Sequence, residues 1–339
     1  MPQGAKRSAG TRKHARAFGP HVLDMDCAAV ARQIEDSIRR TVAQALHRRG
    51  VVVATSGGVD SSVCAALVVR ALGPQRVLAL ILPDRDSSPD SAVRARHLCG
   101  TLGVEFIVED IAPPLEALGC YRRRDEAIRR QFPEYGPGYR QKIAVADDLV
   151  GQDRINYFNL IIESPDGRQS KQRMPLDVYL AVVAATNMKQ RVRKLLEYYH
   201  AERLNYAVAG TPNRLEYDLG FFVRGGDGLA DLKPIAHLYK TQVYAVARHL
   251  DLPDEILRQA PTTDTYGLPQ TQEEFYFPLS YDRMDLALYA FRQGVPAKET
   301  GPVLGLTAEQ VERVYRDIVA KQRTAALLHQ QAILVENVE

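Results

Sequence analysis

Hydrophobic positions in the first third of the chain follow two alternating patterns. Ile34, Ile38, Val42 and Leu46 lie four apart, which predicts a helix with one apolar face that ends at Gly50. Residues 51–54 are continuously apolar and predict a short buried strand. The alternation continues with predicted helices over 63–72 and 88–103 and predicted strands over 76–83 and 104–111. Apolar strands that alternate with helices are typical of a parallel sheet covered on both faces. We therefore predict an α/β fold, a doubly wound parallel sheet with helices on both faces.

The rest of the chain adds further elements to this pattern. We predict a helix over 187–204, a central strand over 205–211 and a helical tail over 306–328. Thr307 and Gln310 have the spacing of a capping box at the start of that tail. The stretch 155–174 predicts a hairpin that turns at residues 165–167.

One domain with a large insertion fits these elements better than two independent domains. The domain spans residues 27–325, and a less regular, partly basic insertion occupies about residues 119–178. A disordered basic tail is expected over residues 1–26, and a C-terminal tail over residues 326–339.

Composition and charge restrict the classes of function. The net charge is only +3, so the fold as a whole is not indicated to bind a polyanion. The four cysteines form no C-x-x-C pair, so neither a zinc site nor a disulfide framework is indicated. No stretch approaches the length of a membrane span, and the basic N-terminal segment lacks the apolar core of a secretory signal. These features predict a cytoplasmic protein with no membrane partner.

The stretch VVVATSGGVDSSVCAAL, residues 51–67, passes from the predicted strand through a Ser-Gly-Gly turn into a helix. Free N–H groups at such a turn, together with the helix dipole, favour an anion. Ser56, Ser61 and Ser62 add hydroxyl donors. Asp60 would repel an anion unless a magnesium ion lay between them. The loop therefore predicts a magnesium–polyphosphate site, and the alternative is an ordinary strand–helix turn capped by serine and aspartate.

Two familiar phosphate-binding patterns are missing from the sequence. Neither G-x-x-x-x-G-K-[ST] nor G-x-G-x-x-G occurs, which disfavours transfer of a terminal phosphate and binding of a dinucleotide on a Rossmann fingerprint. Instead, SGGVDSS at residues 56–62 resembles the pyrophosphatase loop (PP-loop) of the ATP pyrophosphatase superfamily. This resemblance implies an adenine nucleotide α-hydrolase-like sheet and cleavage of ATP between its α- and β-phosphates.

Other motifs resemble one family within this superfamily. NMKQRVRK, GDGLADLKPIAHLYKTQ and APTTD occur in the order and spacing of NAD synthases, and the similarity covers residues 30–118 and 185–325. The resemblance to the ammonia-dependent members implies that the nicotinate carboxylate of deamido-NAD is adenylated by Mg-ATP, with release of pyrophosphate. Attack of ammonia on the acyl-adenylate would then give NAD and AMP. The protein would be an AMP-forming carbon–nitrogen ligase of NAD biosynthesis.

The resemblance also implies roles for individual residues. The implied ATP-binding residues are Ser56, Gly57, Gly58, Asp60, Ser61, Ser62, Arg85, Thr211 and Lys240. Asp60, Lys240 and Thr262 are the implied catalytic residues, and Asp60 and Glu216 the implied magnesium ligands. The acid substrate would be bound by Asn187, Arg191, Arg224 and Asp227. Arg224 stands where the family usually has lysine, which keeps the charge but changes the donor geometry.

The resemblance further implies Mg²⁺ as cofactor, ATP as co-substrate, and a homodimer. Glutamine-using relatives carry a large N-terminal amidase domain, and too few residues precede the first predicted strand here, so free ammonia or a separate amidase is expected. Two alternatives stay open: an amide synthetase that adenylates another carboxylic acid, and a PP-loop tRNA-modifying protein. The second usually carries catalytic cysteines, which this chain lacks in that pattern, so nucleic acid is not an expected partner. The insertion could serve as a lid, a dimer arm or a device for a different acid.

Overall fold

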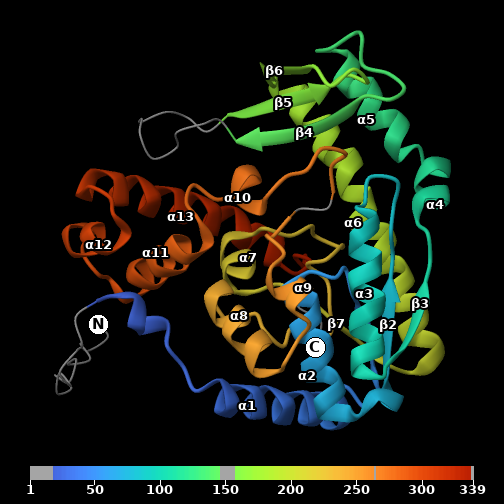
Figure 1. The fold of residues 1–339 in the computed structure, drawn as a ribbon, viewed down its shortest axis with the longest axis vertical. Helices are drawn as coiled ribbons and strands as arrows, with labels where there is room; N and C mark the ends of the chain where they lie inside the picture. The colour runs from blue at the N-terminus through green and yellow to red at the C-terminus, as the bar shows by residue number, and fades with distance from the viewer. Residues whose placement is uncertain (1–17, 146–156, 263–264, 337–339) are drawn as a thin grey trace.

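The computed structural model describes residues 18–145, 157–262 and 265–336. Its central sheet has four parallel strands in the order β3-β2-β1-β7 (Figure 1). These strands are β1 (Val51–Ala54), β2 (Val77–Ile81), β3 (Glu105–Val108) and β7 (Ala207–Ala209). β1 is an inner strand, with Val51 aligned on Val77 of β2 and on Ala207 of β7.

Alternate residues of β1 point to opposite faces of the sheet and enter different cores. Val51 and Val53 pack in a cluster with side chains of α1 (Cys27–Arg40), α2 (Val59–Leu72), α3 (Pro89–Leu102) and α8 (Lys240–His249). Val52 belongs to a second cluster, formed with side chains of α4 (Ala112–Ala117) and α6 (Leu176–Leu204). Helices therefore cover both faces, and the predicted doubly wound parallel sheet is confirmed.

The last strand in this order, β7, lies at the end of the sheet, so the prediction of a central strand over 205–211 is wrong. β7 is apolar although it is an edge strand, because a later segment of the chain covers its outer side. Ala209 forms an isolated parallel bridge with Leu232, and all three residues of β7 are buried.

Three helices have bounds that clearly differ from the prediction, and one of them, α6, begins at Leu176 rather than at residue 187. α2 begins at Val59 rather than at Val63, directly after Gly58, so Asp60 lies in its first turn. α1 ends at Arg40 and continues as a π-helical turn over Thr41–Ala45, short of Gly50. The change of helix type occurs because the N–H of Leu46 donates to the carbonyl of Thr41, five residues earlier.

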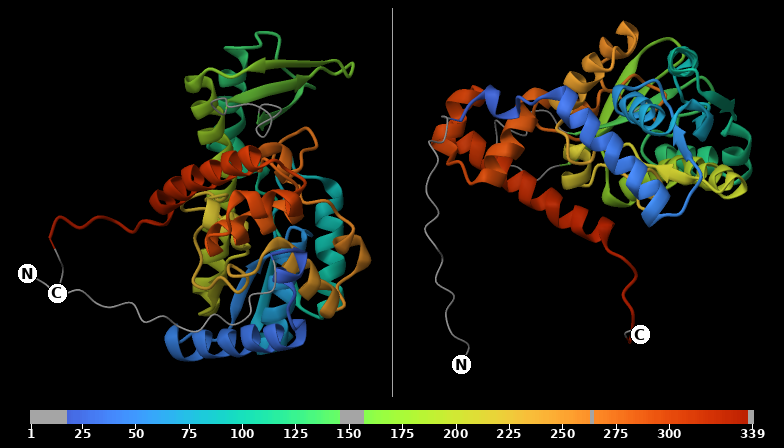
Figure 2. Two further views of the ribbon diagram at one scale, coloured as in Figure 1. Left: turned by 90° about the vertical axis from the view of Figure 1, so that its left-hand side faces the viewer. Right: turned by 90° about the horizontal axis from the view of Figure 1, so that it is seen from below.

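The described residues of the predicted insertion, 119–145 and 157–178, form a projection that we call the arm (Figures 1 and 2). It contains α5 (Cys120–Arg129) and an antiparallel sheet of β4 (Arg140–Val145), β5 (Phe158–Glu163) and β6 (Gln169–Arg173). The predicted hairpin is confirmed, since β5 and β6 pair and Gly167 takes φ 83° in their turn. α6 begins in the arm at Leu176 and continues along the main sheet, so one long helix connects the two parts.

A helical layer completes the molecule beside the sheet. It consists of α7 (Arg214–Leu219), α11 (Tyr281–Gln293), α12 (Ala297–Leu304) and α13 (Ala308–His329), which share one apolar cluster. The capping box at the start of α13 is confirmed: the Gln310 N–H donates to Thr307 Oγ1 at 3.2 Å, and the Thr307 N–H donates to Gln310 Oε1 at 2.9 Å. The short elements are η1 (Pro20–Leu23), η3 (Pro74–Arg76), α9 (Asp254–Leu257) and α10 (Gln272–Phe275).

Both expected tails are partly ordered. α13 continues to His329, inside the segment expected as a C-terminal tail. At the other end, residues 18–26 are not the disordered tail that was expected. Phe18 is partly buried against the helical layer and stacks on Tyr289 at 6.4 Å between ring centroids, which holds this segment in place. Residues 1–17 lie outside the described ranges. Within those ranges, no helix is both long and apolar enough to cross a membrane.

Candidate active site

A cavity of about 570 Å³, which we call the main cavity, opens at the carboxyl ends of β1, β2 and β7. This edge of a doubly wound sheet is where such folds bind ligands. Most of the predicted site residues line it: Ser56, Gly58, Asp60, Ser61, Asn187, Thr211, Glu216, Asp227, Lys240 and Thr262. Six of the nine predicted ATP-binding residues and two of the predicted acid-substrate residues therefore face one shared space.

The PP-loop closes the inner end of this cavity. Gly57 has φ 76°, and a Cβ there would lie 2.7 Å from the carbonyl oxygen of Ser91, so only glycine fits. The Ser61 and Ser62 hydroxyls donate to the Gly58 carbonyl at 3.0 and 2.8 Å. Gly57 and Ser62 are absent from the cavity wall, so they support the loop from behind while Ser56, Gly58 and Ser61 face the cavity.

Asp60 is the centre of a polar cluster at the start of α2. One of its carboxylate oxygens forms an ion pair with the Lys240 ammonium, and the other accepts a hydrogen bond of 3.2 Å from the Asn213 amide. Asn213 also caps α7, because its side chain accepts the Glu216 N–H while Glu216 accepts the Asn213 N–H at 3.0 Å. This reciprocal cap places Glu216 beside Asp60 in the cavity wall.

Asp60 affects the protonation of Glu216. Burial, with the charge of Asp60 as the second cause, raises the pKa of Glu216 to about 8. Burial alone would lower the pKa of Lys240, but the charges of Asp60 and Glu216 outweigh it and raise that pKa. Lys240 is therefore a permanent cation, whereas Glu216 carries a proton at neutral pH unless another cation joins the cluster.

Lys240 is held in place from a distant helix. The carboxylate of Asp285 in α11 accepts the backbone N–H groups of Lys240 at 3.2 Å and of Thr241 at 2.7 Å. Asp285 thereby caps the first turn of α8, where the backbone N–H groups have no intrahelical partner. Burial raises the pKa of Asp285 to about 6, which still leaves the carboxylate ionised at neutral pH.

The residues predicted for the acid substrate fall into two groups. Asn187 and Asp227 line the main cavity, and Asp227 accepts the Val223 N–H at 2.8 Å, which fixes the turn. Arg191 and Arg224 are exposed and do not line the cavity. Arg191 Nε donates to the Arg224 carbonyl at 3.2 Å, so these two arginines lie together on the surface.

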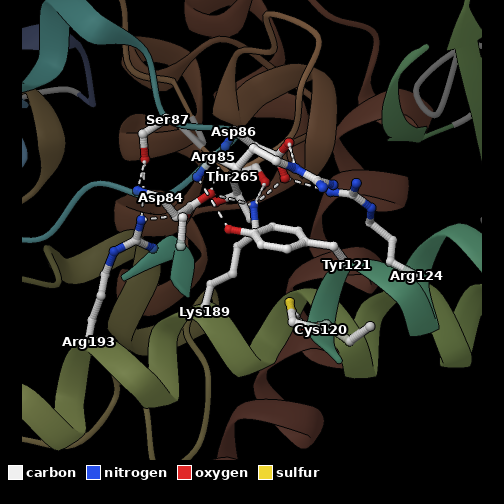
Figure 3. A network of polar contacts seen from close by, with 12 residues as sticks. Asp84, Arg85, Asp86, Ser87, Cys120, Tyr121, Arg124, Lys189, Arg193 and Thr265 are labelled. Atoms are coloured by element: carbon white, nitrogen blue, oxygen red, sulfur yellow. Dashed lines mark hydrogen bonds and ion pairs between the residues drawn. The ribbon is translucent and has the colours of Figure 1, made fainter. Parts of the chain in front are cut away.

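Arg85 also points away from the main cavity. Its guanidinium lies 3.8 Å from the centroid of the Tyr121 ring, on the first turn of α5 (Figure 3). It lines instead a second, neighbouring cavity of about 800 Å³, which we call the side cavity. Thr262 lines both cavities.

Comparison with known proteins identifies the family. The sequence model of the NAD synthase family matches residues 30–131 and 139–325, which includes most of the arm. An NH(3)-dependent NAD(+) synthetase of Rhizobium meliloti (strain 1021) is 54% identical over 95% of this chain and 96% of the relative. The chain belongs to the NAD synthase family.

More distant relatives fit the same family and fold. An NH(3)-dependent NAD(+) synthetase of Thermotoga maritima is 37% identical over 78% of this chain and 86% of its own length. A solved structure described as NMN synthetase from Francisella tularensis superposes with a TM-score of 0.63 at 22% identity, covering 92% of this chain and 99% of its own. At that identity the likeness concerns the fold alone.

Sequence reasoning missed Asn213, Asp285 and Lys189 as parts of the site. Asn213 could have been found, since Asn-x-x-Glu after a strand is a capping-box signal. Asp285 had no local signal, because it caps a helix that begins 45 residues earlier in the chain.

Lys189 is the centre of a buried charged network (Figure 3). Its ammonium is fully buried and donates to Asp84 at 2.9 Å, to Asp86 at 2.6 Å and to the Thr265 carbonyl at 2.8 Å. Arg124 of the arm pairs with Asp86 at 2.5 Å. Burial acts to raise the pKa of Asp86, but the charges of Arg124 and Lys189 outweigh it and lower that pKa. The network thus joins α6, the arm, the loop after β2 and the loop that carries Thr262.

Replacing Lys189 should destabilise the protein strongly. Lys189→Met leaves Asp84 and Asp86 buried without their shared cation, and breaking such a pair costs roughly 3–5 kcal/mol in the free energy of unfolding. Urea unfolding measures this loss, with Lys298→Met, at an exposed position, as the matched control. Equal stabilities of the two variants would contradict the role of the network.

The raised pKa of Glu216 predicts a pH-dependent stability. The native state binds this proton more tightly than the unfolded chain, so the free energy of unfolding falls as pH rises from the ordinary value of 4.5 to about 8. Glu216→Gln mimics the protonated form, and its stability relative to the parent should increase over that range and level off above it. Urea unfolding in EDTA without nucleotide measures the difference. Exposed Glu312→Gln should show no such trend, and a flat difference for Glu216→Gln would contradict the assignment.

Proposed function

We propose that this protein is an ATP-dependent carbon–nitrogen ligase that converts deamido-NAD and ammonia to NAD, AMP and pyrophosphate. In the first step a carboxylate oxygen of the nicotinate attacks the α-phosphorus of ATP, and the bond to the β-phosphate oxygen breaks. In the second step the ammonia nitrogen attacks the acyl carbon. The C–N bond forms, the C–O bond to AMP breaks, and one proton leaves the nitrogen.

The observation that carries this proposal is the Asp60–Lys240 ion pair beside the PP-loop, in a chain 54% identical to an NH(3)-dependent NAD(+) synthetase over nearly the full length of both. Cleavage between the α- and β-phosphates concentrates negative charge on the departing pyrophosphate. A preorganised cation at that point stabilises the transition state more than the ground state. Lys240 fits this task because Asp285 fixes its backbone and burial shields its charge from water.

The residues also fit a magnesium ion held with the phosphates. Among the described residues no group of three or more His, Cys, Asp or Glu side chains could hold a metal. Magnesium commonly uses only one or two carboxylates together with phosphate oxygens and waters, which matches Asp60 and Glu216. The raised pKa of Glu216, caused by burial and by the charge of Asp60, supports this assignment because a bound cation would stabilise the ionised carboxylate. When bound, the ion would neutralise charge on the outer phosphates.

Two further residues of the main cavity suit the acid substrate. Asn187 of α6 and Asp227 of the 223–228 turn line that cavity and offer hydrogen bonds to a neutral polar group such as a pyridine-nucleotide ribose. Because Arg191 and Arg224 lie on the surface nearby, we assign them to the more exposed phosphates of a dinucleotide. The cavity walls around the acyl-adenylate would exclude water, which competes with ammonia for the same carbon.

Deamido-NAD with ammonium and Mg-ATP should give AMP and NAD in equal amounts. The assay measures pyrophosphate release and NAD by chromatography, with nicotinate mononucleotide as a comparison acid. Failure to form NAD, together with AMP-forming turnover of a different acid, would replace this function by amide synthesis on that acid.

Lys240→Met should lower kcat/KM by roughly 10²–10³-fold, since a preorganised transition-state donor is lost. Lys298→Met, which changes an exposed lysine in the same way, should retain parental activity. A Lys240→Met enzyme as active as the parent would remove the ion pair from the mechanism.

A homodimer in the cytoplasm, supplied with free ammonia or served by a separate amidase, remains our prediction. Leu195 and Tyr199 support the dimer, because these large side chains lie one turn apart on α6 and are 68% and 58% exposed. Light scattering should give twice the mass of the chain for the parent and a monomer for Leu195→Glu/Tyr199→Glu. A monomeric parent would contradict the dimer.

A further inference from the structure

The side cavity meets the main cavity next to the PP-loop. Ser91, Arg94 and Thr262 are among the residues that line both cavities. Most of the rest of its wall comes from the loop after β2, from α5 and residues 135–141 of the arm, and from residues 266–270. An anion released at the PP-loop would therefore have the residues at this junction as its immediate neighbours.

Arg94 packs directly on the PP-loop. A Cβ added to Gly57 would lie 2.9 Å from the Cβ of Arg94, so α3 and the loop are in close contact here. An arginine side chain extends several ångströms beyond its Cβ, and Arg94 lines the main cavity at this point. Its guanidinium is therefore within reach of a polyphosphate on the loop.

The guanidinium of Arg94 has no acidic partner among the described residues. Its Nη2 donates to Ser91 Oγ at 3.2 Å, while its Nε is buried and has no hydrogen-bond partner within those residues. Arg85, Arg124 and Arg140 of the same cavity each pair with an acidic side chain, whereas Arg129 donates to the Tyr135 carbonyl. Arg94 thus contributes an uncompensated positive charge beside the loop.

The space next to Arg94 is polar as well as basic. Gln141 of the arm lines the side cavity and is only 1% exposed. Neither atom of its amide has a hydrogen-bond partner among the described residues, and the same holds for Oε1 of the neighbouring Gln270. Buried amides without partners are rare in folded proteins, which indicates a hydrated or ligand-bearing space.

We propose that Arg94 binds the outer phosphates of ATP and then the pyrophosphate that leaves. A guanidinium offers a planar pair of N–H donors that suits phosphate oxygens, and without an acidic partner it need not break an ion pair to bind them. This inference rests on the proposed cleavage of ATP between the α- and β-phosphates. It assigns the β- and γ-phosphates, rather than the α-phosphate, to Arg94.

The test compares binding of ATP, pyrophosphate and AMP by calorimetry in Mg²⁺ buffer. In Arg94→Gln, the dissociation constants of ATP and pyrophosphate should rise about tenfold or more, as expected for loss of a charge-assisted hydrogen bond. AMP lacks the outer phosphates, so its dissociation constant should change less than about twofold, and Arg94→Lys should give an intermediate loss. Arg96→Gln, at an exposed position of the same helix, is the matched control and should bind all three ligands like the parent.

Three results would overturn the inference: unchanged pyrophosphate affinity in Arg94→Gln, an equal loss for AMP, or the same loss in Arg96→Gln. If Arg94→Gln fails to fold, unchanged pyrophosphate affinity in Arg94→Lys would overturn it as well. These measurements need no acid substrate. If the parent does not amidate deamido-NAD, the proposed function fails while the binding result for Arg94 still stands. If it does, and Arg94→Gln binds pyrophosphate normally, only the inference fails.

Discussion

The ion pair between Asp60 and Lys240 is the contact on which the rest of the site depends. Asp60 lies in the first turn of α2, and Lys240 begins α8, so the pair joins the PP-loop to a distant part of the chain. Asn213, Glu216 and Asp285 are arranged around it by two helix caps. Because both partners are largely buried, their charges act on phosphates and neighbouring carboxyls with little screening from water.

The cluster around Asp60 and the network around Lys189 differ in the balance of their positive and negative charges. Around Asp60 two carboxyls share one lysine, which leaves a place for a further cation. Around Lys189, three cations of α6 and the arm meet Asp84 and Asp86, and the partners are satisfied. The first cluster is suited to binding, and the second to holding the arm and the Thr262 loop in place. Arg94 lines both cavities, and its charge has no acidic partner among the described residues.

The PP-loop was predictable because the residues that identify it lie close together in the sequence. Gly57 has to be glycine because of its backbone conformation, and Ser56, Ser61 and Ser62 lie within five residues of it in the sequence. The strand over residues 51–54, the hairpin of the arm and the Thr307 cap follow from short-range pattern in the same way. The edge position of β7 did not follow, since Leu232 covers a strand that is apolar enough to be central.

The sequence by itself determined the α/β alternation, the PP-loop and the family motifs, because periodicity, turn chemistry and motif spacing involve residues that are close along the chain. Only the tertiary structure decided which charges are paired. Arg85 turns to Tyr121, Arg191 lies with Arg224 on the surface, and Asp285 holds Lys240. Ion pairs and caps depend on distances between residues that can be far apart in sequence, and packing of the helices on the sheet sets those distances.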